Sequence, residues 1–176
     1  MLMINADDFG MSTSINQAIV RCFREQLITS TTIMANMPAF EDACRLAHAE
    51  QLSDRIGVHL NLTEGRPLLA EVASCTELCQ ADGQFRRFRS SHLSRTARKL
   101  VAAELHMQIQ SCRAQHLPLG HADSHQHVHN EPALVNTFCR VIREAGIPTL
   151  RCARNSDPGR PTLRRIYKHL LNAYLS

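Results

Sequence analysis

The chain opens with the stretch Met3-Ile-Asn-Ala-Asp-Asp-Phe-Gly10, in which two aspartates follow a short apolar run. We expect residues 2–6 to form the first strand, with Asp7 and Asp8 on the turn that leads into a helix. In α/β enzymes, catalytic residues commonly lie at this position, at the C-terminal end of a strand. Adjacent aspartates repel each other unless a cation neutralises them, so a divalent metal would stabilise the pair. A solvated turn is the competing interpretation, because Asp and Gly are ordinary turn residues.

The composition is typical of one globular domain spanning residues 1–176. Hydrophobic residues make up 44% and charged residues 20% of the chain, which is enough apolar material for a core. No apolar run approaches the ~18 residues that a membrane span needs, and we see no secretory signal. The seven cysteines include no Cys-x-x-Cys pair. We therefore expect reduced thiols and a cytoplasmic protein without a membrane partner.

The net charge of +4 is concentrated towards the end of the chain. Residues 1–139 carry 12 Lys and Arg against 14 Asp and Glu, whereas residues 140–176 carry 8 against 2. A basic tail of this kind can bind nucleic acid. Here no aromatic residues are interleaved with the arginines, so we predict a solvated helix face and no nucleic-acid partner.

Strand-like and helix-like apolar spacing alternate along the chain. The predicted strands cover residues 2–6, 27–36, 56–62, 117–124 and 149–152. The predicted helices cover residues 14–26, about 38–47, 92–115, about 131–146 and 162–175. The first helix is expected to start with a capping box at Ser14 and Gln17. Residues 63–91 are irregular, as in a lid or substrate-facing loop. The order predicts an α/β fold of mostly parallel strands, either an open sheet or part of a (β/α) barrel.

Polar side chains follow three of the predicted strands: Asp7 and Asp8, then His59, then the segment from Asp123 to His129. The carboxyl ends of parallel strands share one edge of the sheet, so these groups should converge there. One carboxylate and two imidazoles are a common ligand set for a divalent catalytic metal. We expect Asp123 to lie on one face of an extended segment with three histidines, His125, His127 and His129. A hydrogen-bonded core histidine or a solvated histidine cluster is the competing interpretation.

Such a site would favour hydrolysis. A metal held by Asp8 and two histidines would lower the pKa of a water molecule and polarise a carbonyl oxygen. Asp7 could take the proton of that water, and a histidine of segment 125–129 could protonate the leaving group or hold the oxyanion. These residues alone leave amide, ester and phosphoester substrates open. They also leave open which histidine of the segment is the ligand.

Four motifs taken together resemble the YdjC-like (ChbG/HpnK) carbohydrate deacetylase family. They are Asn5-Ala-Asp-Asp-Phe-Gly10, Thr29-Ser-Thr-Thr32, Gly57-Val-His-Leu-Asn-Leu62 with Glu64-Gly-x-Pro67, and Asp123-Ser-His-Gln-His-Val-His129. The resemblance implies a deformed (β/α) barrel that removes an acetyl group from an N-acetylated sugar, such as a chitooligosaccharide. It implies Asp8, His59 and His125 as metal ligands and Asp7 as the catalytic base. It also implies Mg²⁺ and, in many members, a homodimer, whereas imidazole ligands would favour Zn²⁺.

Members of this family are typically longer and carry a further His-Pro motif near the C-terminus. We therefore expect the barrel to be incomplete at its C-terminal end. Two other functions stay open: a metal-dependent phosphoesterase or amidohydrolase, suggested by His125-x-His127, and a non-catalytic metal- or sugar-binding remnant. Four arginines of the irregular segment are expected either to shape a substrate groove or only to aid solubility: Arg66, Arg86, Arg87 and Arg89.

Overall fold

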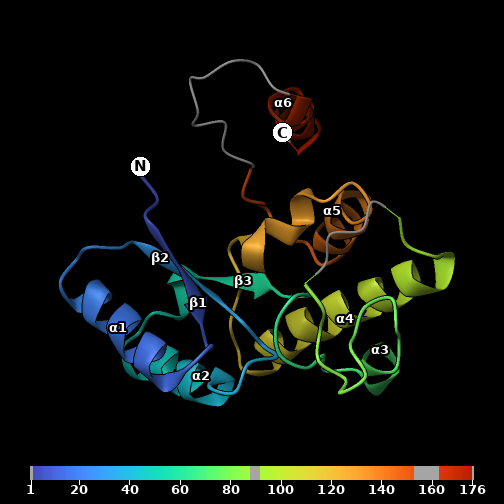
Figure 1. Cartoon of the computed structure of the whole chain (residues 1–176). Coiled ribbons are helices and arrows are strands. Elements are labelled where there is room, and N and C mark those ends of the chain that lie inside the picture. The colour runs from blue at the N-terminus through green and yellow to red at the C-terminus, as the bar shows by residue number, and fades with distance from the viewer. Residues whose placement is uncertain (1, 88–91, 153–162, 176) are drawn as a thin grey trace.

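One parallel sheet organises the computed structural model, which describes residues 2–87, 92–152 and 163–175 (Figure 1). Neighbouring strands pair in the order β1-β2-β3-β4, and every pairing is parallel. The strands are β1 (Asn5–Phe9), β2 (Ser30–Ile33), β3 (Ile56–Leu60) and β4 (Ala122–Ser124). This confirms the predicted α/β class and the parallel sheet.

Within the described residues, six α-helices and two short 3₁₀ segments connect or follow these strands. The helices are α1 (Thr13–Arg24), α2 (Phe40–Ala49), α3 (Ala70–Ala73), α4 (Arg95–Ala114), α5 (Val135–Glu144) and α6 (Leu163–Leu175). The 3₁₀ segments are η1 (Ser53–Arg55) and η2 (His125–Asn130). None of the helices in the described ranges is long and apolar enough to cross a membrane.

Several predicted boundaries are wrong. The first strand begins at Asn5 and includes both aspartates, so they lie within the strand and not on the turn after it. The cap of α1 is Ser12, whose hydroxyl accepts from the Ile15 amide at 3.3 Å, and Ser14 already lies inside the helix. The predicted fifth strand is reduced to a single parallel bridge between Ala122 and Leu150.

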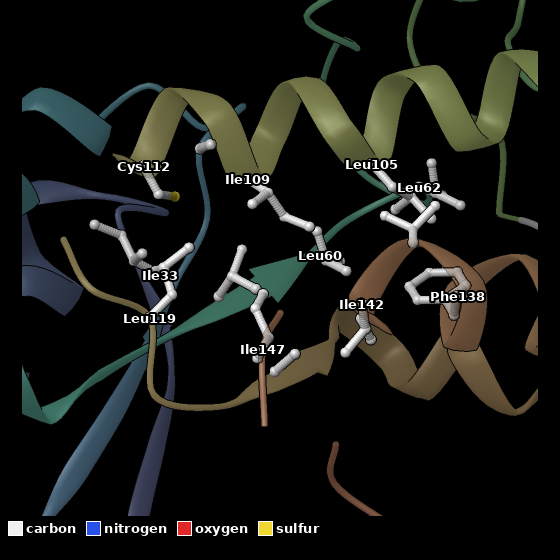
Figure 2. Close-up of a cluster of buried hydrophobic side chains, with 14 of the residues drawn as sticks. Ile33, Leu60, Leu62, Leu105, Ile109, Cys112, Leu119, Phe138, Ile142 and Ile147 are labelled. Atoms are coloured by element: carbon white, nitrogen blue, oxygen red, sulfur yellow. The ribbon is translucent and has the colours of Figure 1, made fainter. Parts of the chain in front are cut away.

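The apolar core lies between the sheet and the helices that pack against it, and Figure 2 shows the part beside α4 and α5. Leu60 of β3 meets Leu105 and Ile109 of α4 there, and Phe138 and Ile142 of α5 close the cluster. These side chains are all buried. The period-2 pattern of β3 sends its aliphatic residues to this side, so its other residues, His59 among them, face the opposite side of the sheet.

That opposite side is polar and strongly curved. Parallel strands lie about 4.8 Å apart, so a flat sheet would separate β1 from the bridge at Leu150 by roughly 19 Å. Yet Nη1 of Arg151 lies 2.8 Å from Oδ2 of Asp7. Likewise, Nε2 of His121, just before β4, lies 3.1 Å from Oδ1 of Asn5 in β1. The sheet therefore curls as the wall of a (β/α) barrel does, and its concave face collects polar side chains from every strand.

Gly57 lies where His121 packs closely against β3. A Cβ atom at this position would lie 2.5 Å from the carbonyl oxygen of His121 and 2.7 Å from its ring. We expect Gly57→Ala to lower the free energy of unfolding by about 3 kcal/mol, because the crowded backbone of the neighbouring strand has to move. Urea denaturation measures this change. Gly120→Ala is the matched control, since a Cβ there meets nothing within 4 Å, and an equal loss in both variants would contradict the packing argument.

Candidate metal centre

A bulge in β1 turns both aspartates to the concave face of the sheet. The register of β1 against β2 shifts between Ala6 and Phe9, and Asp8 adopts a left-handed backbone conformation with φ of 71°. In a regular strand, adjacent side chains point to opposite faces. The extra residue of the bulge removes that alternation, and Asp is one of the few residues that tolerates positive φ. Asp7 and Asp8 can therefore act at the same site.

His59, one residue before the C-terminal end of β3, lies between two carboxylates. Its Nε2 lies 3.1 Å from Oδ1 of Asp8, and its Nδ1 is hydrogen-bonded to Oδ1 of Asp123 on the adjacent strand. The hydroxyl of Thr32 lies 3.2 Å from the same Nδ1 and 3.3 Å from Oδ2 of Asp123. His59 and Asp123 are both buried. Side chains from β1, β2 and β4 thus hold the imidazole ring of His59 in one orientation.

His125 approaches the same carboxylate oxygen from the other side. Its Nδ1 lies 3.0 Å from Oδ1 of Asp8, and its Nε2 lies 3.0 Å from Oε2 of Glu64. The centroids of the His59 and His125 rings are 5.5 Å apart, with their planes at 71°. Asp8 Oδ1 is therefore shared by one nitrogen of each ring. The ligand atoms of Asp8, His59 and His125 all lie within 4.8 Å of one another.

The expected cluster of three histidines on an extended segment is wrong. Residues 125–130 form a kinked 3₁₀ segment in which Gln126 and His127 have positive φ. His127 is exposed, whereas His129 is buried and turned away from Asp8. His129 Nε2 donates to the carbonyl oxygen of Arg151 at 3.0 Å, and its Nδ1 accepts from the hydroxyl of Ser124 at 2.6 Å. Burial lowers the pKa of His129 to about 4, which fits a neutral structural ring.

Electrostatics favour a cation among Asp8, His59 and His125. Burial opposes charge on His59, but its hydrogen bonds with Asp123 and Asp8 outweigh burial and raise its pKa to about 9. The pKa of His125 is also raised, because hydrogen bonds to Asp8 and Glu64 outweigh its burial. The pKa of Asp8 is lowered by its hydrogen bonds to His125 and then to His59. The carboxylates around the two rings thus favour positive charge there, which is the kind of charge that a divalent cation would supply.

A second group of ligand atoms, from Asp7, His59 and Asp123, also lies within 4.8 Å. The guanidinium of Arg151, which is permanently charged, already contacts two carboxylates of this group. Nη1 of Arg151 lies 2.9 and 2.8 Å from the two carboxylate oxygens of Asp7 and 3.1 Å from Oδ2 of Asp123. Asn5 Nδ2 also donates to Asp7 Oδ1 at 2.8 Å. Because the guanidinium of Arg151 already contacts both Asp7 and Asp123, the group of Asp8, His59 and His125 fits a divalent metal better.

Sequence reasoning missed two residues of this site, Arg151 and Glu64. Arg151 was counted only with the basic tail, and Glu64 only as part of a motif. The strand predicted at residues 149–152 contains Arg151, and extending the shared-edge argument to that strand is the signal that could have found it. Nothing local to Glu64 indicates that it reaches His125, because this contact joins residues 61 positions apart.

The arginines of segment 63–91 do not act as one group. Arg66 lines a groove of about 520 Å³ together with Met37, Phe40, Glu41 and Gln84 among others. The Arg86 guanidinium is used locally, since it donates to the carbonyl oxygen of Cys79 at 3.0 and 3.2 Å. Arg89 lies outside the described residues. Only Arg66 among the described arginines of this segment therefore lines that groove.

Comparison with known proteins identifies relatives that match most of the chain. A family model described as YdjC-like protein matches residues 1–175. A carbohydrate deacetylase of Brevibacillus brevis is 40% identical over 147 residues, covering 84% of this chain and 57% of that protein. A carbohydrate deacetylase of Geobacillus stearothermophilus is 38% identical over 164 residues, covering 92% of this chain and 63% of that protein.

A solved structure shares the fold. It is a protein of Enterococcus faecalis V583 named as a candidate cellobiose-phosphate cleavage protein, and it superposes with a TM-score of 0.76 at 25% sequence identity. The superposition covers 98% of this chain and 64% of that one. The chain thus spans about six-tenths of the length of these relatives. With a family match along nearly its whole length and a shared barrel-wall fold, the chain belongs to the YdjC-like family.

Proposed function

We propose that the protein is a divalent-metal-dependent hydrolase that removes acetyl groups from N-acetylated sugars. One observation carries the proposal: Asp8 Oδ1 lies within hydrogen-bond distance of Nε2 of His59 and Nδ1 of His125, with the Asp7 carboxylate beside His59. Asp8, His59 and His125 would hold the metal. The relatives named carbohydrate deacetylase support an acetylated sugar as substrate.

The chemistry divides between the two aspartates. A bound divalent cation supplies Lewis acidity, which polarises the amide carbonyl and acidifies a water molecule. Asp7 acts as the general base that takes the proton of that water. Arg151 and Asn5 hold the Asp7 carboxylate towards the concave face and prevent it from rotating away. Water attack on the carbonyl carbon gives a tetrahedral adduct. The carbon–nitrogen bond then breaks as the proton held by Asp7 passes to the leaving nitrogen, which releases acetate and the free amine.

The choice of metal and the cellular context belong to the same proposal. We propose Mg²⁺ from the family resemblance, with Zn²⁺ as the alternative that two imidazole ligands favour. A cytoplasmic location fits the seven cysteines, which all lie in the described ranges and are all unpaired there. A homodimer is carried over from the resemblance alone.

The proposal is tested by acetate release from N,N′-diacetylchitobiose. Protein stripped with a chelator is assayed alone and after addition of Mg²⁺ or Zn²⁺, and we expect acetate only after metal is restored. Phosphate release from a phosphorylated disaccharide is measured in parallel, because the Enterococcus structure bears a name that points to cellobiose phosphate. Phosphate release without acetate would favour a phosphoesterase. Tight metal binding with neither product would indicate a binding protein and would overturn the proposed activity.

A further inference from the structure

Each imidazole of the candidate centre faces a carboxylate with both of its ring nitrogens. We call the nitrogen that faces Asp8 the inner nitrogen and the other one the outer nitrogen. For His59 the inner nitrogen is Nε2, facing Asp8, and the outer one is Nδ1, facing Asp123. For His125 the arrangement is reversed, with Nδ1 facing Asp8 and Nε2 facing Glu64. An imidazole that binds a metal through one nitrogen carries its proton on the other, where an acceptor fixes the tautomer and the ring orientation.

The two outer carboxylates differ in their surroundings. The Asp123 side chain is 2% exposed and also accepts from Thr32 and Arg151, so it cannot turn away from His59. The Glu64 side chain is 48% exposed and reaches His125 from the loop after β3. A buried carboxylate interacts more strongly with a neighbouring charge than one in contact with water. Asp123 should therefore influence its histidine more than Glu64 does.

Glu64 is nevertheless held by a buried network. The amide oxygen of Asn61 accepts from the Glu64 backbone amide at 3.2 Å, and its amide nitrogen donates to the Glu64 carbonyl at 2.8 Å. Gln108 of α4 fixes Asn61 through both of its backbone groups, at 2.9 and 2.8 Å. Glu104 accepts from the amides of Leu68 and Leu69 further along the same loop. The loop is thus anchored to α4 on both sides of Glu64.

We propose that Asp123 and Glu64 are positioning residues that make the two histidines bind the metal in opposite tautomers, His59 through Nε2 and His125 through Nδ1. This inference rests on the proposed metal site. Nδ1 of His59 keeps its proton and donates it to Asp123, and Nε2 of His125 keeps its proton and donates it to Glu64. Loss of either carboxylate lowers the basicity of the ligand nitrogen and frees the ring to turn, so the metal is held less tightly.

Metal affinity is the first test. Chelator-stripped protein is titrated calorimetrically with Zn²⁺ and with Mg²⁺. We expect Asp123→Asn to weaken binding by roughly 10–100-fold, the range typical of such outer partners, and Glu64→Gln by about 3–10-fold because it is half exposed. Glu144→Gln is the matched control, because Glu144 faces His106 at the same 3.0 Å distance on the surface of α4 and α5. Affinities equal to wild type in both site variants would overturn the inference.

The tautomers provide a test on the wild-type protein, which stands even if Asp123→Asn fails to fold. Long-range ¹H–¹⁵N spectra of the metal-loaded protein should show a proton on Nδ1 of His59 and on Nε2 of His125. The same tautomer on both rings would contradict the proposal. A wild-type protein that binds neither metal would instead defeat the proposed function. Acetate release with equal metal affinity in all variants would defeat only this inference.

Discussion

Asp8→Asn is expected to abolish metal-dependent acetate release while leaving the fold intact. Asp8 Oδ1 is the one atom that both inner imidazole nitrogens share, at 3.1 and 3.0 Å. The variant removes the negative charge that the metal needs and leaves two imidazoles facing an amide. Loss of the cation removes about 4 kcal/mol of stabilisation of developing charge, or roughly 1,000-fold in rate. We also expect metal binding in calorimetry to weaken by about 100-fold or more.

Asp42→Asn is a suitable control for Asp8→Asn. Asp42 lies on α2, where it accepts from Asn16 and Arg45 and has no contact with the two histidines. It should keep full metal affinity and full activity. Circular dichroism of both variants confirms that the comparison is between folded proteins. Acetate release at the wild-type rate from Asp8→Asn would contradict the assignment of Asp8.

The class of the fold could be read from the sequence because it depends on local spacing. Aliphatic residues at every second position of β3 predict a strand buried on one side and leave His59 on the other. The same alternation along the chain predicts the parallel sheet, and a shared sheet edge brings Asp8, His59 and the segment 123–129 together. Both inferences need only the order of strands and helices along the chain. The structure confirms the parallel sheet and brings Asp8, His59 and His125 together.

The geometry within the site depends on features that no local pattern encodes. The bulge that turns Asp7 and Asp8 to one face arises from the register of β1 against β2, and the expectation of a turn after residue 6 was wrong for this reason. The kink at Gln126 and His127 separates the histidines that an extended segment would have aligned. Arg151 reaches Asp7 only because the sheet curls, which is a property of all its strands together.

Asp7→Asn is expected to reduce turnover by roughly 100- to 10,000-fold, the range typical of a lost general base, while metal affinity stays unchanged. The asparagine is isosteric, and its amide oxygen can still accept from Arg151, so the surroundings of the site should keep their positions. What disappears is the capacity to take a proton from water. The two variants should therefore differ in their metal affinity. Asp8→Asn should lose both metal binding and activity, whereas Asp7→Asn should lose activity alone.

This contrast separates the two groups of ligand atoms that the fold brings together. If the metal were held by Asp7, His59 and Asp123, then Asp7→Asn would remove a metal ligand. Its metal affinity and its turnover would then fall together. Arg151 argues against that arrangement, because a divalent cation beside Asp7 and Asp123 would have to share both carboxylates with a guanidinium that contacts them at 2.8 to 3.1 Å. Calorimetric titration and acetate release measured on the same preparation distinguish the two arrangements. A metal affinity for Asp7→Asn reduced in proportion to its activity would move the metal to the second group and remove Asp7 from the role of base.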